Sequence, residues 1–330
     1  MSVYAQKKKA DEDTTISFTS FKNKIVLFGD LGFNTSPFSI HFKSAQTNID
    51  KLRFRNNLPM VMGLGFSYKW LTLRLSFPII SNLRNKEKFG HTSYFGIGGD
   101  FPIKSMHFSI EYKRYNGYVI KNAYKWDPTI DKKYKNLYQL DVGTYSLSLE
   151  SYFFKNKDFK FNNLRGKTGH YNKEVKTWYI KGHVDLQGVS NGADPIIPVP
   201  LGDSSNSKTF STALSSFDFG AIPGYAYVNR LGNWQFAAMM AFGPVIQAKF
   251  YNYDGNSRGF LGLSPRYDVQ MFGGYNHPKW FIMLHTVLDN KFILINDLKY
   301  FNFSYSIKLV GGYRFTTKKE SKKNEKKDPI

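Results

Sequence analysis

Residues 303–315, FSYSIKLVGGYRF, alternate between apolar and polar side chains along most of their length. The apolar parity holds Phe303, Tyr305, Ile307, Leu309, Tyr313 and Phe315, and the polar parity holds Ser304, Ser306, Lys308 and Arg314. A period of two predicts a strand with one apolar and one polar face. The segment exceeds the roughly 9–11 residues that a tilted strand needs to cross a bilayer, and aromatic residues lie at both ends. This pattern is typical of a transmembrane strand, with an amphipathic strand of a soluble sandwich as the alternative.

The composition of the 330 residues fits an all-β protein. Aromatic residues make up 17% of the chain, with 30 Phe and 22 Tyr, and such residues favour strands. The mean hydropathy is −0.41, as expected where apolar outward and polar inward residues average out. The longest uncharged and mostly apolar run, residues 236–248, is too short for a spanning helix. Because there is no cysteine, disulfides, thiolate zinc sites and a lipid-anchored cysteine are excluded.

The same alternation recurs along the chain and predicts 12 strands. We expect them at residues 22–43, 60–68, 71–77, 92–101, 106–112, 138–154, 159–186 (interrupted at 165–173), 217–227, 234–250, 261–275, 280–288 and 303–315. In the first strand the apolar parity switches at Ser36-Pro37, which predicts a bulge with a register shift in one long bent strand. Pro223, Pro244 and Pro265 fall inside three successive strands, and predict either a kinked band or strands that end there.

The predicted connections alternate in length. Five are short, near residues 69, 102–104, 156–158, 228–233 and 276–279, and six are mostly longer, near 44–52, 80–91, 120–137, 188–212, 252–259 and 289–301. Outer-membrane barrels show this asymmetry, with tight periplasmic turns, longer extracellular loops, an even strand number and both termini inside. The sequence therefore predicts a closed antiparallel transmembrane β-barrel of about 12 strands in the outer membrane of a Gram-negative cell.

The predicted domain organisation is a barrel between two polar ends. Residues 1–20 are interpreted as a flexible arm, 21–315 as the barrel, and 316–330 as a disordered lysine-rich tail in the periplasm. Residues 2–6 resemble the end of a secretory signal peptide, with Val3 and Ala5 as the small residues, or are an ordinary disordered start.

Several short motifs resemble a known family. They are YKWL at residues 68–71, FG at 219–220, PGYAY at 223–227, FGP at 242–244 and GYRF at 312–315. Together they resemble an uncharacterised family of Gram-negative outer-membrane barrels that is catalogued only as a domain of unknown function. The resemblance covers roughly residues 20–315 and implies fold and location without supplying catalytic residues. The closing Tyr313 and Phe315 resemble the aromatic-ended last strand that the barrel-assembly machinery recognises, and are the predicted membrane-insertion signal.

The sequence holds no recognisable catalytic, metal or cofactor constellation. None of the seven histidines has HExxH spacing, and neither a phosphate-binding GxxxxGK[ST] motif nor a GxSxG motif is present. His285-Thr286 invites comparison with the His and Ser of barrel lipid hydrolases, but a third orienting group is missing from the sequence pattern. A histidine in an amphipathic strand is the simpler interpretation. We therefore predict no enzyme, no cofactor and no metal site.

Charged residues on the polar parity are the remaining candidates. Asp218, Arg266, Asp268, Lys308 and Arg314 are predicted to face the lumen, either as structural charges that fill a closed interior or as a network that tunes a pore. The net charge of +21 is spread along the chain, so we interpret it as solvated surface and polar loops and predict no nucleic-acid partner.

Four functions follow as hypotheses. The first is a barrel without a catalytic site, serving as an accessory or scaffold subunit of an envelope complex. The alternatives are a narrow channel for small polar or anionic solutes, a lipid hydrolase using His285, and a soluble basic β protein that binds nucleic acid. Predicted partners are outer-membrane lipids and lipopolysaccharide, the assembly machinery and other envelope proteins.

Overall fold

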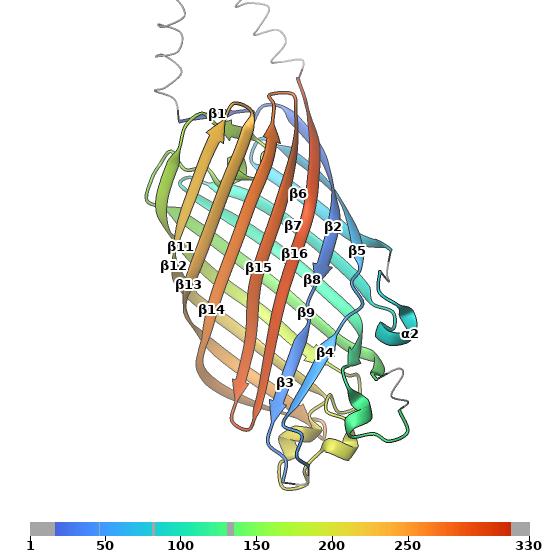
Figure 1. The fold of residues 1–330 in the computed structure, drawn as a ribbon. Helices are drawn as coiled ribbons and strands as arrows, with labels where there is room; N and C mark the ends of the chain where they lie inside the picture. The colour runs from blue at the N-terminus through green and yellow to red at the C-terminus, as the bar shows by residue number, and fades with distance from the viewer. Residues whose placement is uncertain (1–16, 46, 81–82, 131–134, 318–330) are drawn as a thin grey trace, which may run out of the picture.

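The computed structural model describes residues 17–45, 47–80, 83–130 and 135–317. Its main feature is a closed antiparallel ring of 12 strands (Figure 1). In ring order these are β2 (Ile25–Thr35), β5 (Met60–Tyr68), β6 (Leu71–Ile80), β7 (Ser93–Ile103), β8 (Met106–Ile120), β9 (Leu137–Phe154), β11 (Val175–Ser190), β12 (Ala213–Leu231), β13 (Trp234–Tyr253), β14 (Asn256–Asn276), β15 (Trp280–Ile295) and β16 (Leu298–Phe315). The predicted fold class is confirmed.

The segment around residues 303–315 closes the ring. It lies in β16, which pairs with β15 on one side and with β2 on the other, from Tyr305 opposite Thr35 to Phe315 opposite Ile25. Closure leaves no free edge where the first and last strands meet, which is the requirement for a sheet that crosses lipid. Ser17 and Thr317, the first and last described residues, lie at the same end of the barrel as the tight turns, here called the turn end.

At the opposite end, here called the loop end, the wall loses two strands. β3 (Phe38–Phe42) and β4 (Lys51–Arg55) continue β2 and β5 as a hairpin. β4 then pairs directly with β8, Phe54 opposite Ile120, because β6 and β7 stop short. Ten strands therefore surround the lumen there, which narrows the opening that the loops must cover.

The register shift predicted at Ser36-Pro37 is wrong. Thr35 pairs with Tyr305 and Phe38 with Asn302, so β2 and β3 follow β16 in one register. Apolar residues change sides because their surroundings change. Leu27 and Leu31 face outward in the wall, whereas Phe38 and Ile40 face inward where the loop end is filled by apolar side chains.

Two predicted outer loops are in fact hairpin turns. β13 and β14 are joined by Asp254 and Gly255, both at positive φ (49° and 71°), and β15 and β16 by Asn296-Asp297. Positive φ angles at Asp254 and Gly255 favour a tight two-residue turn. Most residues of the predicted loops 252–259 and 289–301 therefore belong to strands β13 to β16, which their polarity pattern did not show.

One predicted strand is also wrong in part. Residues 155–174, which include the predicted short turn at 156–158, leave the wall and fold into the turn end of the lumen. This segment, here called the plug, holds α3 (Phe161–Leu164) and β10 (Gly169–Tyr171). β10 pairs with β1 (Phe18–Ser20), so these residues of the predicted flexible arm form a strand. Residues 1–16 and 318–330 lie outside the described residues.

The three prolines lie within continuous strands, so the alternative that the strands end there is wrong. Pro244 and Pro265 are direct partners at one height, and Pro223 lies opposite Ile180. The β12–β13 ladder is interrupted between Phe219 and Gly224 without a change of register. The prolines thus form a band of weakened main-chain pairing across β12, β13 and β14.

Beyond this band β14 and β15 separate. Their pairing ends at Asp268 opposite Asp289, although both strands run on toward the loop end. Side chains replace the missing ladder. Asn290 accepts from the main-chain N–H of Tyr267 at 2.6 Å and donates to the carbonyl of Pro265 at 2.9 Å. Gln247 donates to the carbonyl of Phe292, so backbone groups in this gap are satisfied by the lumen side chains.

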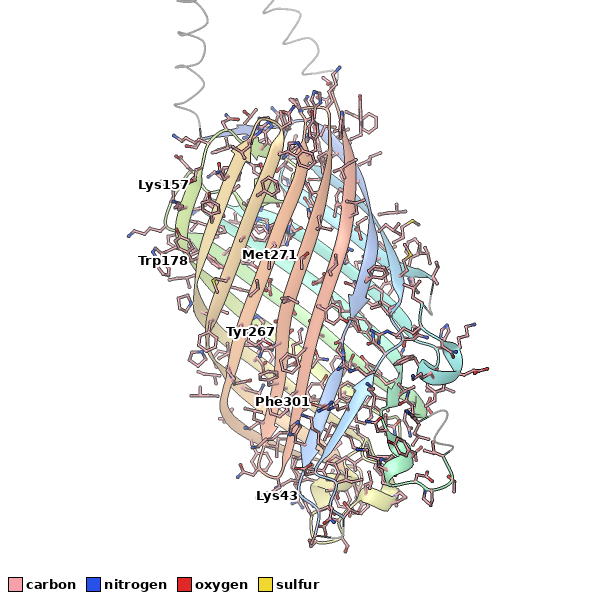
Figure 2. The ribbon with its side chains drawn as sticks, viewed as in Figure 1. Lys43, Lys157, Trp178, Tyr267, Met271 and Phe301 are labelled. Atoms are coloured by element: carbon pink, nitrogen blue, oxygen red, sulfur yellow. The ribbon has the colours of Figure 1, made fainter. Side chains whose placement is uncertain are left out.

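The outer surface of the wall is apolar between its two ends. Exposed large side chains include Leu64, Leu73, Ile97, Leu147, Phe242, Leu284 and Leu309. Four of the five tryptophans, Trp70, Trp178, Trp234 and Trp280, are exposed where strands meet the turn end, as in the aromatic girdle of a bilayer-spanning barrel. Figure 2 places Lys43 and Lys157 toward opposite ends, with Trp178, Met271 and Tyr267 between them.

Among the described residues no helix is both long enough and apolar enough to span a membrane.

Candidate functional site

The lumen is filled by two apolar clusters with a charged layer between them. The turn-end cluster contains Phe28, Phe161, Leu164, Phe272 and Phe281, and the loop-end cluster contains Phe38, Phe54, Tyr118, Ile197 and Tyr300, each with further members. The charged layer comprises the ionised side chains of the inward parity between these clusters. An open porin differs from this arrangement, because its lumen is polar along its whole length.

The plug is fixed to the wall by buried polar side chains. Arg314 donates to the main-chain oxygens of Gly166 and, at 3.1 Å, Lys167. Gln235 of β13 donates to the carbonyl of Asn163 at 2.8 Å and accepts from the N–H of Tyr171 at 3.0 Å. These bonds join main-chain groups of the plug to side chains of the wall strands, so the plug is part of the folded barrel.

Ion pairs join the plug to the charged layer. The Nη1 atom of Arg165 donates to both carboxylate oxygens of Asp100 in β7, at 2.9 and 2.8 Å. The ammonium group of Lys167 lies 3.5 Å from the same carboxylate. Burial lowers the pKa of Lys167 to about 8; Asp100 opposes this shift and Arg165 adds to it. Asp100 belongs to a wall strand and is only 6% exposed, so its ion pairs with the plug lie inside the barrel and anchor the plug to the wall.

The loop end is closed by residues 191–212. Ile196, Ile197 and Leu201 are buried in the loop-end cluster. Asp203 accepts from the N–H of Ala45 at 2.5 Å, and Lys208 donates to the carbonyl of Asn296 at 2.9 Å. The loop therefore spans the opening and is bonded to the hairpins on the other side.

Arg266 is the centre of one charged cluster. It is 2% exposed and contacts Asp218 and, at 2.9 Å, Asp185, which also accepts from Lys291 at 3.1 Å. His183, Asp185 and Asp218 lie close enough together to hold a metal ion. Arg266 and Lys291 already neutralise these carboxylates, so the arrangement is that of an ion-pair network.

A second cluster is centred on Lys181. Its ammonium lies 2.7 Å from Glu150 and 3.1 Å from Asp268. Glu150 also accepts from the hydroxyl of Tyr152 at 2.7 Å, and Asp268 from the amide of Gln270 at 2.9 Å. A third pair is the bidentate bond from Arg74 to Asp30, at 2.6 and 2.8 Å. A side chain at Gly63 would collide with Asp30, its Cβ lying 2.2 Å from Oδ2, so a glycine is required there.

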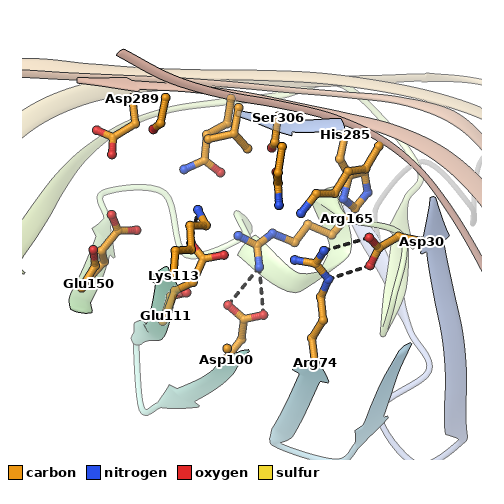
Figure 3. A pocket seen from close by; sticks show the side chains of 18 of the residues that line it. Asp30, Arg74, Asp100, Glu111, Lys113, Glu150, Arg165, His285, Asp289 and Ser306 are labelled. Carbon is orange, nitrogen blue, oxygen red and sulfur yellow. Dashed lines mark hydrogen bonds and ion pairs between the residues drawn. The ribbon is translucent and has the colours of Figure 1, made fainter. Parts of the chain in front are cut away.

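The charged layer encloses a cavity of about 150 Å³ (Figure 3). Its carboxylates are Asp30, Asp100, Glu111, Glu150, Asp268 and Asp289. Its basic side chains are Arg74, Lys113, Arg165, Lys167, Lys291 and Lys308. Figure 3 shows Arg74, Arg165 and His285 at one end of the cavity and Glu150 and Asp289 at the other. The charges balance in number, and most of them are joined in ion pairs.

The structure places all five predicted lumen charges inside the barrel, each less than a tenth exposed. Arg266 contacts Asp218, and Asp268 forms an ion pair with Lys181. Lys308 lines the cavity, and Arg314 donates to the main chain of the plug. Sequence reasoning missed Asp30, Arg74, Asp185 and Lys181. Their parity opposite to the outward apolar residues was the signal that could have found them.

His285 also faces the lumen. It lines the cavity, and its Nε2 atom is buried without a hydrogen-bond partner among the described residues. A lipid hydrolase needs its histidine at the lipid surface, whereas on this strand Leu284 and Leu288 hold that position. Tyr313 and Phe315, the predicted insertion signal, are 46% and 45% exposed on the outer face of β16.

A closed β-barrel with an apolar band, an aromatic girdle and charges buried inside is a transmembrane barrel of the outer-membrane type. The predicted fold and outer-membrane location are confirmed by these features, which also place lipid against the outer face. The chain belongs to the family described as a domain of unknown function (DUF4421), which matches residues 19–315. The family-level resemblance seen in the sequence is thereby confirmed.

Solved structures of similar shape are outer-membrane barrels. The outer membrane protease OmpT from Escherichia coli has a TM-score of 0.42 at 8% identity, covering 92% of this chain and 100% of that chain. The translocator domain of the autotransporter NalP from Neisseria meningitidis has 0.41 at 8%, covering 95% and 97%. The COG4313 outer membrane channel from Pseudomonas putida F1 has 0.39 at 11%, covering 89% and 96%. Likeness at this level says nothing about what this chain binds or does. No curated protein sequence matches the chain.

Proposed function

We propose that this protein is a closed outer-membrane barrel without a catalytic site, which serves as an accessory or scaffold subunit of an envelope complex. The observation that carries the proposal is the filling of the lumen at both ends by the chain itself. The turn-end cluster includes plug residues such as Phe161 and Leu164, and the loop-end cluster includes Ile196 and Leu201 of the covering loop. A solute would have to cross two apolar layers.

The anchoring of both layers supports a permanently closed lumen. The plug is held by Arg314, Gln235 and the Arg165–Asp100 ion pair, which come from different parts of the ring. Opening it would leave several buried donors and carbonyls without partners, each costing roughly 1–3 kcal/mol. A barrel that carries nothing through its lumen acts through its surfaces, as a scaffold subunit does.

Two experiments test the two parts of the proposal. The purified full chain in planar bilayers is expected to give no conductance steps, and regular open-channel currents would contradict a closed lumen. Mild detergent extraction of the native protein from its own membranes, followed by identification of co-purifying proteins, is expected to give stoichiometric envelope partners. The extraction is repeated after cross-linking in the cells, which retains weakly bound partners. Recovery of the chain alone from cross-linked cells would contradict the scaffold role.

A narrow channel for small polar solutes is the second candidate. The observation that favours it is the charged cavity between the two apolar layers. Transport would require the plug or the covering loop to move. Conductance that appears only when Arg314 or Arg165 is replaced would show that the pathway exists but is closed in the unaltered protein.

A further inference from the structure

Two of the ionisable side chains that line the central cavity have no ion-pair partner among the described residues. Ten of the 12 ionisable side chains around it lie within 4.0 Å of a group of opposite charge. Lys308 and Asp289 are the exceptions within the part of the chain that the structure describes. Keeping a group ionised inside the lumen without an opposite charge is costly, so ion pairing within the fold gives no reason for either residue.

The two residues lie at different heights on neighbouring strands. Lys308 of β16 is 6% exposed and lies directly opposite His285 of β15. Asp289 lies four residues further along β15, about 13 Å toward the loop end at the rise of a strand. Figure 3 shows the corresponding separation, with His285 at one end of the cavity and Asp289 at the other.

The charged neighbours of both residues are themselves paired. Lys308 is the strand partner of His285, whose Nε2 has no hydrogen-bond partner among the described residues, and Figure 3 shows Arg74 at this end bonded to Asp30. At the end where Asp289 lies, Figure 3 shows the carboxylate of Glu150, which is paired with Lys181. The charge left without an ion-pair partner is therefore that of Lys308 at the first end and that of Asp289 at the second.

We propose that the cavity binds a small ω-amino acid, a zwitterion whose two charges lie at opposite ends of a short chain, with its carboxylate at Lys308 and His285 and its ammonium group at Asp289. The cavity of about 150 Å³ has room for on the order of ten water molecules, and hence for a solute of roughly ten non-hydrogen atoms. A dianion would bring its second negative charge to Asp289, and a dication would bring its second positive charge to Lys308. This inference goes beyond the proposed scaffold role. A closed barrel whose cavity binds no solute could still act as a scaffold, but it would contradict the proposed ligand binding.

A matched set of ligands tests the charge pattern. The chain is refolded in detergent with 6-aminohexanoate, hexanoate, hexylamine or adipate, so that entry is not limiting, and binding is measured by calorimetry and by the shift in Tm. We expect 6-aminohexanoate to bind at least about tenfold more tightly than the other three. Equal binding of all four, or a Kd for 6-aminohexanoate weaker than about 10 mM, would overturn the proposal.

Two variants assign the ends. In Lys308→Met, 6-aminohexanoate should bind no better than hexylamine, because the partner of the carboxylate is gone. In Asp289→Asn, it should bind no better than hexanoate. Lys299→Met and Asp254→Asn, both exposed, are the controls and should bind like the unaltered chain. Lys308→Gln replaces Lys308→Met if the latter fails to fold, and unchanged selectivity in a folded Lys308 variant rejects the assignment.

Discussion

Arg314, next to the last residue of the final strand, donates from its guanidinium to the main-chain oxygen of Gly166, 148 residues earlier in the chain. The same group reaches the side-chain oxygen of Asn276 at 2.6 Å, so one side chain joins the last strand, the plug and the β14–β15 turn. The strand that closes the ring therefore also closes the lumen.

Replacing Arg314 should loosen the plug. Arg314→Met removes several buried hydrogen bonds, and we expect the free energy of unfolding to fall by about 2–4 kcal/mol. Amide exchange in residues 160–171 should accelerate before the wall unfolds, which hydrogen-exchange mass spectrometry would detect. Arg258→Met, at an exposed position of β14, is the control and should leave both measurements unchanged. Protected plug amides in Arg314→Met would show that the arginine does not hold the plug.

Arg266 should be needed for stability rather than for binding. Arg266→Met leaves the carboxylates of Asp185 and Asp218 buried with less positive charge, at a cost of about 3–5 kcal/mol. Adding Asp218→Asn removes one of those charges and should recover part of the loss, because Lys291 still pairs with Asp185. Urea titration of the single and double variants in micelles measures both steps. A double variant less stable than Arg266→Met would contradict this network.

His170 of the plug should make stability depend on pH. Burial, reinforced by the positive charges of Arg230 and Arg314, lowers its pKa from 6.5 to about 3. Between these values the unfolded chain binds the proton and the folded chain does not. Stability should therefore fall as the pH drops below about 6.5, by up to about 1.4 kcal/mol per pH unit.

The measurement is the urea midpoint at pH 7, 5 and 4 for the unaltered chain and for His170→Asn. The variant should lose less stability on acidification than the unaltered chain. His91→Asn, an exposed position, is the control. Parallel pH profiles for the unaltered chain and His170→Asn would refute the role of this histidine.

Asn290 should stabilise the part of the wall where β14 and β15 separate. Asn290→Ala removes its bonds to Tyr267 and Pro265 and should cost about 1–3 kcal/mol. Asn290→Asp keeps the acceptor for the N–H of Tyr267 but loses the donor, so it tests which bond matters more. Thermal unfolding of the three proteins gives the order. Asn252→Ala, at an exposed position of β13, should have no effect, and equal stability of Asn290→Ala would show that water satisfies this gap.

Phe315 should matter for insertion more than for stability. Phe315→Ser changes a half-exposed residue on the outer face, so refolding in detergent should differ little. If Tyr313 and Phe315 form the insertion signal, the amount of folded barrel in cell membranes should fall several-fold. Heat-modifiable migration on gels compares the two conditions. Normal membrane levels of Phe315→Ser together with Tyr313→Ser would reject the signal.

The sequence by itself determined the barrel, its strand number and its outward face. Phe303, Ile307 and Leu309 alternate with Ser304, Ser306 and Lys308 because lipid and lumen lie on opposite sides of a strand, and that periodicity is local. The same logic placed Asp218, Arg266 and Lys308 in the interior. It could not pair Arg266 with Asp185, since partners 81 residues apart are set by the strand order and the tilt of a closed ring.

Only the tertiary structure decided that the lumen is closed and where its cavity lies. Residues 155–174 resemble an interrupted strand because Phe159 and Phe161 are apolar at a spacing of two, yet they pack inward against Tyr152 and Tyr171. Where the chain leaves the bilayer, water replaces lipid outside, so apolar residues such as Phe38 and Ile40 turn inward. A parity rule that assumes lipid outside fails at that boundary, because the surroundings of a residue and not its spacing decide which side of the wall it takes.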